Sequence, residues 1–156
     1  MLRWLWLSLL VIVLDQITKQ WAERSFELYE RLPVTDFFNL TLAYNRGAAF
    51  SFLADAGGWQ QFFFIGLAVV VCVYLVFFLR SLKSSQWPLA LGVVMIIGGA
   101  IGNVIDRLIY GHVIDFLDFY VNNWHWPAFN LADSAITLGV VLFLWDSVFS
   151  KEDTIH

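Results

Sequence analysis

Four long apolar stretches alternate with more polar segments along the chain. They cover about residues 4–21, 59–79, 88–105 and 128–149. Each approaches the roughly 20 residues that an α-helix needs to cross a ~30 Å hydrocarbon core. The pattern therefore predicts four transmembrane helices. The first stretch begins like a secretory signal, with Arg3 before the apolar run "WLWLSLLVIVL". The following "DQITKQWAERSFE" contains no small-residue cleavage site, so we expect a retained span.

Two polar segments separate these stretches on one expected side of the membrane. Residues 23–58 contain "FFNLTLAYNRGAAFSFLA", whose aromatic and threonine residues and turn-like "NRG" favour a small strand-rich cap. In "HVIDFLDFYV" of residues 106–127, Asp115 and Asp118 would face opposite ways in a strand but share a face in a helix. We predict an all-α integral membrane protein: one membrane domain over residues 1–156, four transmembrane helices and a small strand-rich extracytoplasmic cap.

Positive charges predict the orientation. The short flanks of the spans carry Arg3, Arg80, Lys83 and Lys151. Cytoplasmic flanks are enriched in Lys and Arg. The three positive flanks lie before the first span, between the second and third spans, and after the fourth span, so all three can lie on the same side of the membrane. Both termini are therefore expected in the cytoplasm, and the two segments described above are expected on the outer face.

Composition supports a membrane protein and excludes several classes. The chain is 60% hydrophobic and 14% charged, unlike an ordinary soluble domain. A net charge of −4 with scattered Lys and Arg argues against a nucleic-acid partner. The single cysteine, Cys72, excludes an intramolecular disulfide, and no zinc-ligand spacing occurs, so we expect no metal and no cofactor.

Polar residues gather where two apolar stretches meet the outer segments. Asn103, Asp106 and Arg107 end the third stretch, and Asn130 and Asp133 open the fourth, each set at helical spacing. An unpaired carboxylate at membrane depth is costly, which favours a functional role. Structural alternatives are a polar clamp at the third helix end and a complement to the helix dipole in the fourth.

Asp115 precedes the fourth stretch closely enough to meet Asp133. Two carboxylates in a partly dry site tend to share one proton. The ionised member can take a proton from water while its protonated partner donates a hydrogen bond to a carbonyl oxygen, which is acid–base hydrolysis of an amide. Asp15 and Lys19, one helical turn apart, suit mutual pairing.

Three other functions fit parts of this pattern. A magnesium-dependent lipid phosphotransferase would use Asp115 and Asp118 as metal ligands. A proton or ion carrier would use intramembrane acids as a relay, distributed across the depth of the membrane. A non-enzymatic membrane scaffold would leave the paired Asn and Asp residues unexplained.

Five strings carry a resemblance over nearly the whole chain. In order they are "LDQITK", "YNRGAAFSF", "GGAIGNVIDR", "HVIDF" and "FNLADSAI". With them the chain resembles the bacterial lipoprotein signal peptidases, also called signal peptidase II or prolipoprotein signal peptidase. The resemblance implies an aspartic endopeptidase of the bacterial inner membrane that removes the signal peptide from lipid-modified prolipoproteins, just before the diacylglyceryl-cysteine. Its expected partners are those substrates and membrane lipids, and we expect a monomer with its active site towards the outer face.

The resemblance also implies roles for individual residues. The catalytic pair falls on Asp115 of "HVIDF" and Asp133 of "FNLAD". The supporting or substrate-binding set is Asn45, Asn103, Arg107 and Asn130. The polar residues with more structural roles are Asp15, Lys19, Arg46 and Asp106.

Overall fold

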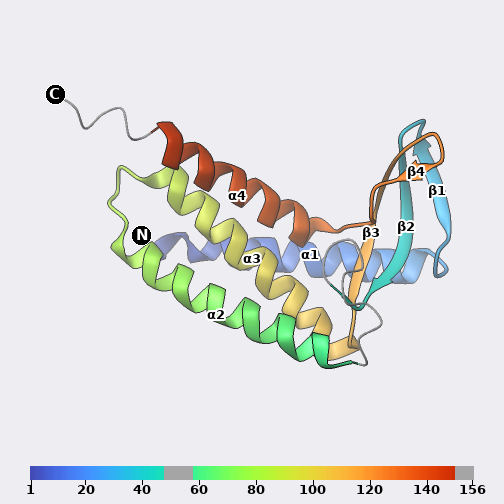
Figure 1. The fold of residues 1–156 in the computed structure, drawn as a ribbon, viewed down its shortest axis with the longest axis horizontal. Coiled ribbons are helices and arrows are strands. Elements are labelled where there is room, and N and C mark those ends of the chain that lie inside the picture. The colour runs from blue at the N-terminus through green and yellow to red at the C-terminus, as the bar shows by residue number, and fades with distance from the viewer. Residues whose placement is uncertain (48–57, 150–156) are drawn as a thin grey trace.

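The computed structural model describes residues 1–47 and 58–149. A short 3₁₀ turn, η1 (Leu2–Trp4), leads into the helices α1 (Leu5–Ser25), α2 (Trp59–Ser81), α3 (Trp87–Tyr110) and α4 (Leu131–Phe149). The helices run along the long axis of the molecule, and a small sheet stands at one end of them (Figure 1). Lys151 and the last residues of "YNRGAAFSF" lie outside the described residues.

The sheet has four antiparallel strands in the order β1-β2-β3-β4. They are β1 (Arg31–Thr35), β2 (Phe38–Asn45), β3 (Val113–Val121) and β4 (Trp124–His125). The expectation of an all-α protein is therefore wrong. Strands from residues 23–58 and from residues 106–127 pair with each other through β2 and β3, so the cap is not confined to residues 23–58.

Strand pairing also decides the conformation of "HVIDFLDFYV". This segment is β3, with Ala43 opposite Asp115 and Asn39 opposite Asp118. The register shifts between Leu40 and Ala43, which marks an irregularity in β2. Both aspartates are buried, with only 2% of Asp115 and 3% of Asp118 exposed.

Helices α1, α2 and α3 extend beyond the predicted apolar stretches, whereas α4 begins three residues after the predicted start at 128. α1 continues to Ser25 and α3 to Tyr110, because polar residues continue each helix past its apolar part. Gly111, with φ 71°, ends α3 in the left-handed conformation that glycine tolerates. Within the described residues, α2 and α3 are the helices long and apolar enough to cross a membrane by length and composition.

Glycines bring α3 and α4 into backbone contact. A Cβ on Gly92 would lie 2.7 Å from the carbonyl oxygen of Gly139, and a Cβ on Gly139 would lie 2.5 Å from that of Gly92. A Cβ on Gly99 would collide with the carbonyl oxygen of Ala132. Small residues allow such close helix packing in membranes. This contact places the polar end of α3 beside the first turn of α4.

Replacing Gly99 with alanine should destabilise the protein. The added methyl group has no space, so α3 and α4 must separate, at a cost of about 1–3 kcal/mol. Gly66→Ala is the matched control, because a Cβ there meets no atom within 4 Å and alanine favours helix. Thermal unfolding in detergent should show a lower Tm for Gly99→Ala alone. Equal Tm values for the two variants would contradict the close contact.

Candidate active site

Asn130 joins two carboxylates from different elements. Asp115 lies on β3, and Asp133 lies in the first turn of α4. The side-chain amide of Asn130 donates to Asp115 Oδ1 at 2.7 Å, and its backbone N–H donates to Asp133 Oδ2 at 3.3 Å. We call Asp115 and Asp133 the aspartate pair. One fully buried residue therefore contacts both members.

Asn130 holds this position because it caps α4. The backbone N–H of Asp133 donates to Asn130 Oδ1 at 2.9 Å, which completes a reciprocal capping box with the bond from Asn130 N–H. Just before the cap, Phe129 exchanges backbone hydrogen bonds with Leu117 of β3 at 3.0 and 2.9 Å. The helix start is thus fixed to the strand that carries Asp115. Asn130 therefore both caps α4 and contacts Asp115.

Two further amides complete the contacts of the aspartate pair. Asn45 Nδ2 donates to Asp115 Oδ2 at 3.2 Å. Asn103 Nδ2 donates to Asp133 Oδ1 at 2.8 Å, while its Oδ1 accepts from Asn130 Nδ2 at 3.2 Å. Each of the four carboxylate oxygens therefore accepts a hydrogen bond. The structure brings together the three asparagines that the resemblance implied.

The environment of Asp115 favours its protonated form. Burial raises the pKa of Asp115 to about 8, and the negative charge of Asp133 raises it as a second cause. Hydrogen bonds from Asn45 and Asn130 favour the ionised form and act in the opposite direction. Burial and the neighbouring charge thus both favour a proton on the aspartate pair, and such a proton belongs to the pair as a unit.

A buried lysine organises the surroundings of the aspartate pair. Lys19 Nζ lies 2.7 Å from Asp15 Oδ2, 2.8 Å from Asp106 Oδ2 and 2.9 Å from Asn103 Oδ1. Lys19, Asp15 and Asp106 are all fully buried. A buried charge is tolerated when it is paired and hydrogen-bonded. We call these three residues the lysine cluster.

The lysine cluster also holds the backbone beside each member of the aspartate pair. Ala132 N–H donates to Asp15 Oδ1 at 2.9 Å, and Ala132 directly precedes Asp133. Ile114 N–H donates to Asp106 Oδ2 at 3.2 Å, and Ile114 directly precedes Asp115. The ion cluster between α1 and α3 therefore constrains the start of α4 and of β3 together.

The two arginines have different surroundings. Arg107 donates to the carbonyl oxygens of Asn103 at 3.3 Å and Gly47 at 3.0 Å, and its guanidinium lies 5.3 Å from the ring centroid of Phe64. Among the described residues, its buried Nε has no hydrogen-bond partner. Arg46 is exposed and contributes its carbonyl oxygen to a 2.6 Å bond from Gln61. Within the described part of the chain, the structure does not bring the Arg46 side chain to the aspartate pair.

A cavity of about 720 Å³ opens beside Asp133, and we call it the active-site cavity. Its polar part is formed by Asn45, Asn103, Arg107 and Asp133. The rest of its lining is largely apolar and includes Val113, Trp126, Phe129, Ile136 and Leu138. A cavity with a few convergent polar groups in an apolar wall suits an apolar ligand with one polar reacting bond.

Asp118 belongs to a separate cluster. It accepts a hydrogen bond from Asn39 Nδ2 at 2.9 Å, and both its oxygens lie 2.9 Å from His125 Nδ1. It also lies 3.7 Å from Arg31 Nε. Asp115 and Asp118 therefore have different partners, and the structure does not assemble them as two ligands of one metal. The described residues contain no group of three or more His, Cys, Asp and Glu that could hold a metal ion.

Sequence reasoning missed two supporting contacts. Gln16 Nε2 donates to Asp106 Oδ1 at 2.8 Å. The sequence indicated this contact only in that Gln16 is a second polar residue, next to Asp15, in an apolar stretch. Tyr44 donates to Glu23 Oε1 at 2.6 Å, and this bond raises the pKa of Tyr44 to about 12. The bond fastens the end of β2, next to Asn45, to α1. No local pattern marks a contact between such distant residues.

Comparisons with known proteins identify the family. The family model described as signal peptidase (SPase) II matches residues 7–149. The lipoprotein signal peptidase of Cupriavidus necator is 57% identical over 94% of this chain and 83% of its own length. That of Yersinia pseudotuberculosis is 52% identical over 97% of this chain and 90% of its own.

Solved structures of bacterial membrane enzymes share the fold. One, obtained by the in meso method at 2.3 Å resolution, has a TM-score of 0.86 and 28% identity, covering 96% of this chain and 89% of its own. Another, at 1.9 Å resolution, has a TM-score of 0.79 and 29% identity, and the match covers 91% of this chain and 90% of the other. The resemblance found in the sequence is thus confirmed, and the chain belongs to the signal peptidase II family of proteases in the bacterial inner membrane.

Proposed function

We propose that the protein is an intramembrane aspartic endopeptidase that removes the signal peptide from lipid-modified prolipoproteins, cutting just before the diacylglyceryl-cysteine. The observation that carries the proposal is the bridge by Asn130 between Asp115 and Asp133 beside a largely apolar cavity. Membership of the family supports the substrate class. The clustering of the acids at one end of the helices favours a hydrolytic site over a relay distributed across the membrane.

In this mechanism the two aspartates exchange one proton with the reacting groups. Asp133 takes a proton from water, whose oxygen attacks the scissile carbonyl carbon, while protonated Asp115 donates a hydrogen bond to the carbonyl oxygen. The carbon–nitrogen bond then breaks as Asp133 passes this proton to the leaving nitrogen, which becomes the amine of the lipidated cysteine, and Asp133 is ionised again. Asn45, Asn103 and Asn130 hold the two carboxyl groups in place. Arg107, whose Nε is without a partner among the described residues, is positioned to contact the substrate backbone.

We further propose that all four helices cross the membrane as a single monomeric domain. They contain 21, 23, 24 and 19 residues, or about 29–36 Å at 1.5 Å per residue, which suits a ~30 Å hydrocarbon core. The charged groups of Asp15 and Lys19 in α1 are buried within the protein, as a span requires. Positive flanks support cytoplasmic termini, with the aspartate pair and the sheet at the outer face.

Removing either member of the aspartate pair should abolish most activity. Asp115→Asn and Asp133→Asn keep size and most hydrogen bonding but cannot exchange the proton, so each should lower turnover about a hundredfold or more. The double variant should lower turnover little more than either single variant, because the effects of residues that act as a unit are non-additive. The measurement is accumulation of lipidated, uncleaved prolipoprotein, with enzyme abundance determined in parallel.

Asp118→Asn provides a matched control. Asp118 lies on the same strand as Asp115, is equally buried and also accepts a hydrogen bond from an asparagine amide. Its replacement should change turnover only a few-fold. Near-normal cleavage by well-expressed Asp133→Asn would refute the mechanism, as would a severe loss in Asp118→Asn alone.

The protonation of Asp115 can be measured directly. Carbon-13 NMR of labelled aspartates should show a carboxyl group titrating near pH 8, which disappears in Asp115→Asn. In Asp133→Asn the pKa of Asp115 should fall, because the neighbouring negative charge is removed. It should stay above its usual 3.8 because burial remains. A titration near pH 4 in the wild-type protein would contradict a shared proton.

The orientation can be tested by cysteine labelling. In a Cys72→Ala background, Asp36→Cys in the exposed β1–β2 turn should react with a membrane-impermeant thiol reagent added to spheroplasts. Lys83→Cys, exposed between α2 and α3, should react only after the membrane is opened. The reverse pattern would overturn the proposed topology.

A further inference from the structure

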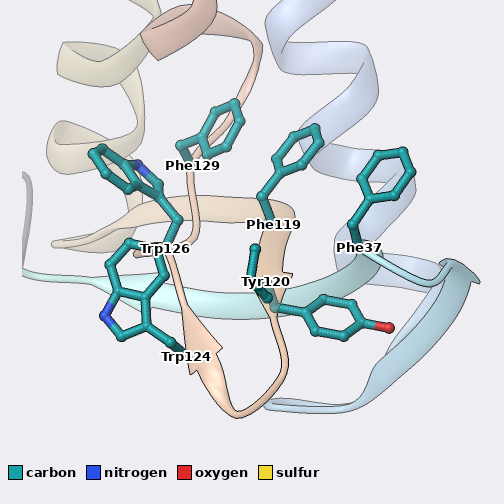
Figure 2. A pocket seen from close by; sticks show the side chains of 7 residues that line it. Phe37, Phe119, Tyr120, Trp124, Trp126 and Phe129 are labelled. Carbon is teal, nitrogen blue, oxygen red and sulfur yellow. The ribbon is translucent and has the colours of Figure 1, made fainter.

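A second cavity, of about 400 Å³, lies on the sheet, and we call it the aromatic cavity. Six of its seven lining side chains are aromatic, and the seventh is Val121. Figure 2 shows Phe37, Phe119 and Phe129 following one another along one side, with Trp124 and Trp126 beside them. Two of them, Trp126 and Phe129, also line the active-site cavity, and the mechanism above gives the other five no role.

The aromatic cavity is held open by backbone contacts. Trp126 N–H donates to the carbonyl oxygen of Phe119 at 2.7 Å, and Tyr120 N–H donates to that of Phe37 at 3.0 Å. The ring of Phe119 stacks on Phe129 with centroids 5.8 Å apart and lies 6.4 Å from that of Phe37. The walls are thus fixed by the pairing of the strands. The backbone positions that carry the cavity walls are therefore set by the sheet.

The aromatic cavity adjoins the active-site cavity. Trp126 and Phe129 line both of them. Phe129 also directly precedes Asn130, the residue that joins the aspartate pair. A ligand in the aromatic cavity would therefore share two walls with a substrate at the site of cleavage.

The lining selects the chemistry of the occupant. The hydroxyl group of Tyr120 already donates to the carbonyl oxygen of Thr35 at 3.1 Å, so it is engaged outside the cavity wall. A peptide in such surroundings would lose hydrogen bonds from its own N–H and C=O groups, at a cost of about 1–3 kcal/mol for each unsatisfied group. A hydrocarbon chain has no such groups, and burying each CH₂ contributes about 0.8 kcal/mol.

We propose that the aromatic cavity binds an acyl chain of the substrate's own diacylglyceryl group. This inference rests on the proposed function, because the chain is attached to the cysteine whose amide bond is cut. The shared walls favour the substrate chain over a bilayer phospholipid, since a chain tethered at the scissile bond enters from the adjoining cavity. Binding at a distance from the reacting bond acts on the ground state and the transition state alike, so it should affect KM rather than kcat.

The test combines acyl-chain length with the wall of the aromatic cavity. Two synthetic prolipoprotein peptides of one sequence carry either two palmitoyl or two hexanoyl chains on the diacylglyceryl-cysteine. The variants are Trp124→Ala and Phe37→Ala, whose side chains line the aromatic cavity but not the active-site cavity and are 61% and 56% exposed. Trp59→Ala is the matched control, since Trp59 is 55% exposed and, like Trp124, makes an edge contact with a neighbouring aromatic ring.

Wild-type enzyme and Trp59→Ala should show a several-fold lower KM for the long-chain peptide. Trp124→Ala and Phe37→Ala should each raise that KM several-fold, leave kcat within about twofold and leave the KM for the short-chain peptide unchanged. An equal rise in KM for both peptides would overturn the proposal, because it would indicate that the side chain contacts the bilayer or has a structural role. Unchanged kinetics in both variants would also overturn it while leaving the proposed function intact. Failure of wild-type enzyme to cleave either peptide would instead refute the proposed function, and this proposal with it.

Discussion

The arrangement of the candidate site depends on one buried positive charge. Without the Lys19 ammonium, Asp15 and Asp106 would be two neighbouring carboxylates buried without a counterion, which is strongly unfavourable. With it, they can turn their remaining hydrogen-bonding capacity to the N–H groups of Ala132 and Ile114. A charge in the first helix thereby controls where the fourth helix and the third strand begin. A site held on rigid elements in this way keeps its geometry.

Folding and chemistry use the same contacts at this end of the helices. The glycine contact between α3 and α4 lets Asn103 reach both Asp133 and Asn130. Asn130 is at once a helix cap and the common partner of the aspartate pair. Substitutions in these contacts therefore affect stability and geometry together, which is why enzyme abundance has to be measured beside activity.

The sequence predicted the features that depend on local spacing. Helices form over all four apolar stretches, and Asn103 with Asp106 and Asn130 with Asp133 share helical faces because a helix repeats every 3.6 residues. The sheet was only partly predicted: strands were expected in one outer segment, yet β2 pairs with β3 from the other. Such pairing depends on packing between distant segments, as do the contact of Lys19 with Asp106 and the approach of Asp115 to Asp133. Spacing and the cost of a carboxylate at membrane depth indicated Asn103, Asn130, Asp115 and Asp133. The resemblance added Asn45 and assigned the catalytic and supporting roles.

The second helix is packed very differently from the third. In α2 the described buried residues are Gln60, Leu75 and Leu79, whereas α3 buries eleven residues, among them Gly99, Gly102 and Asn103. Most positions of α2 need only be apolar, while most positions of α3 must also have a particular size. Over evolutionary time, α2 is therefore free to exchange one apolar residue for another, and sequence divergence among related enzymes should concentrate in it. Low conservation along this helix would then reflect an absence of shape constraints and not an absence of importance.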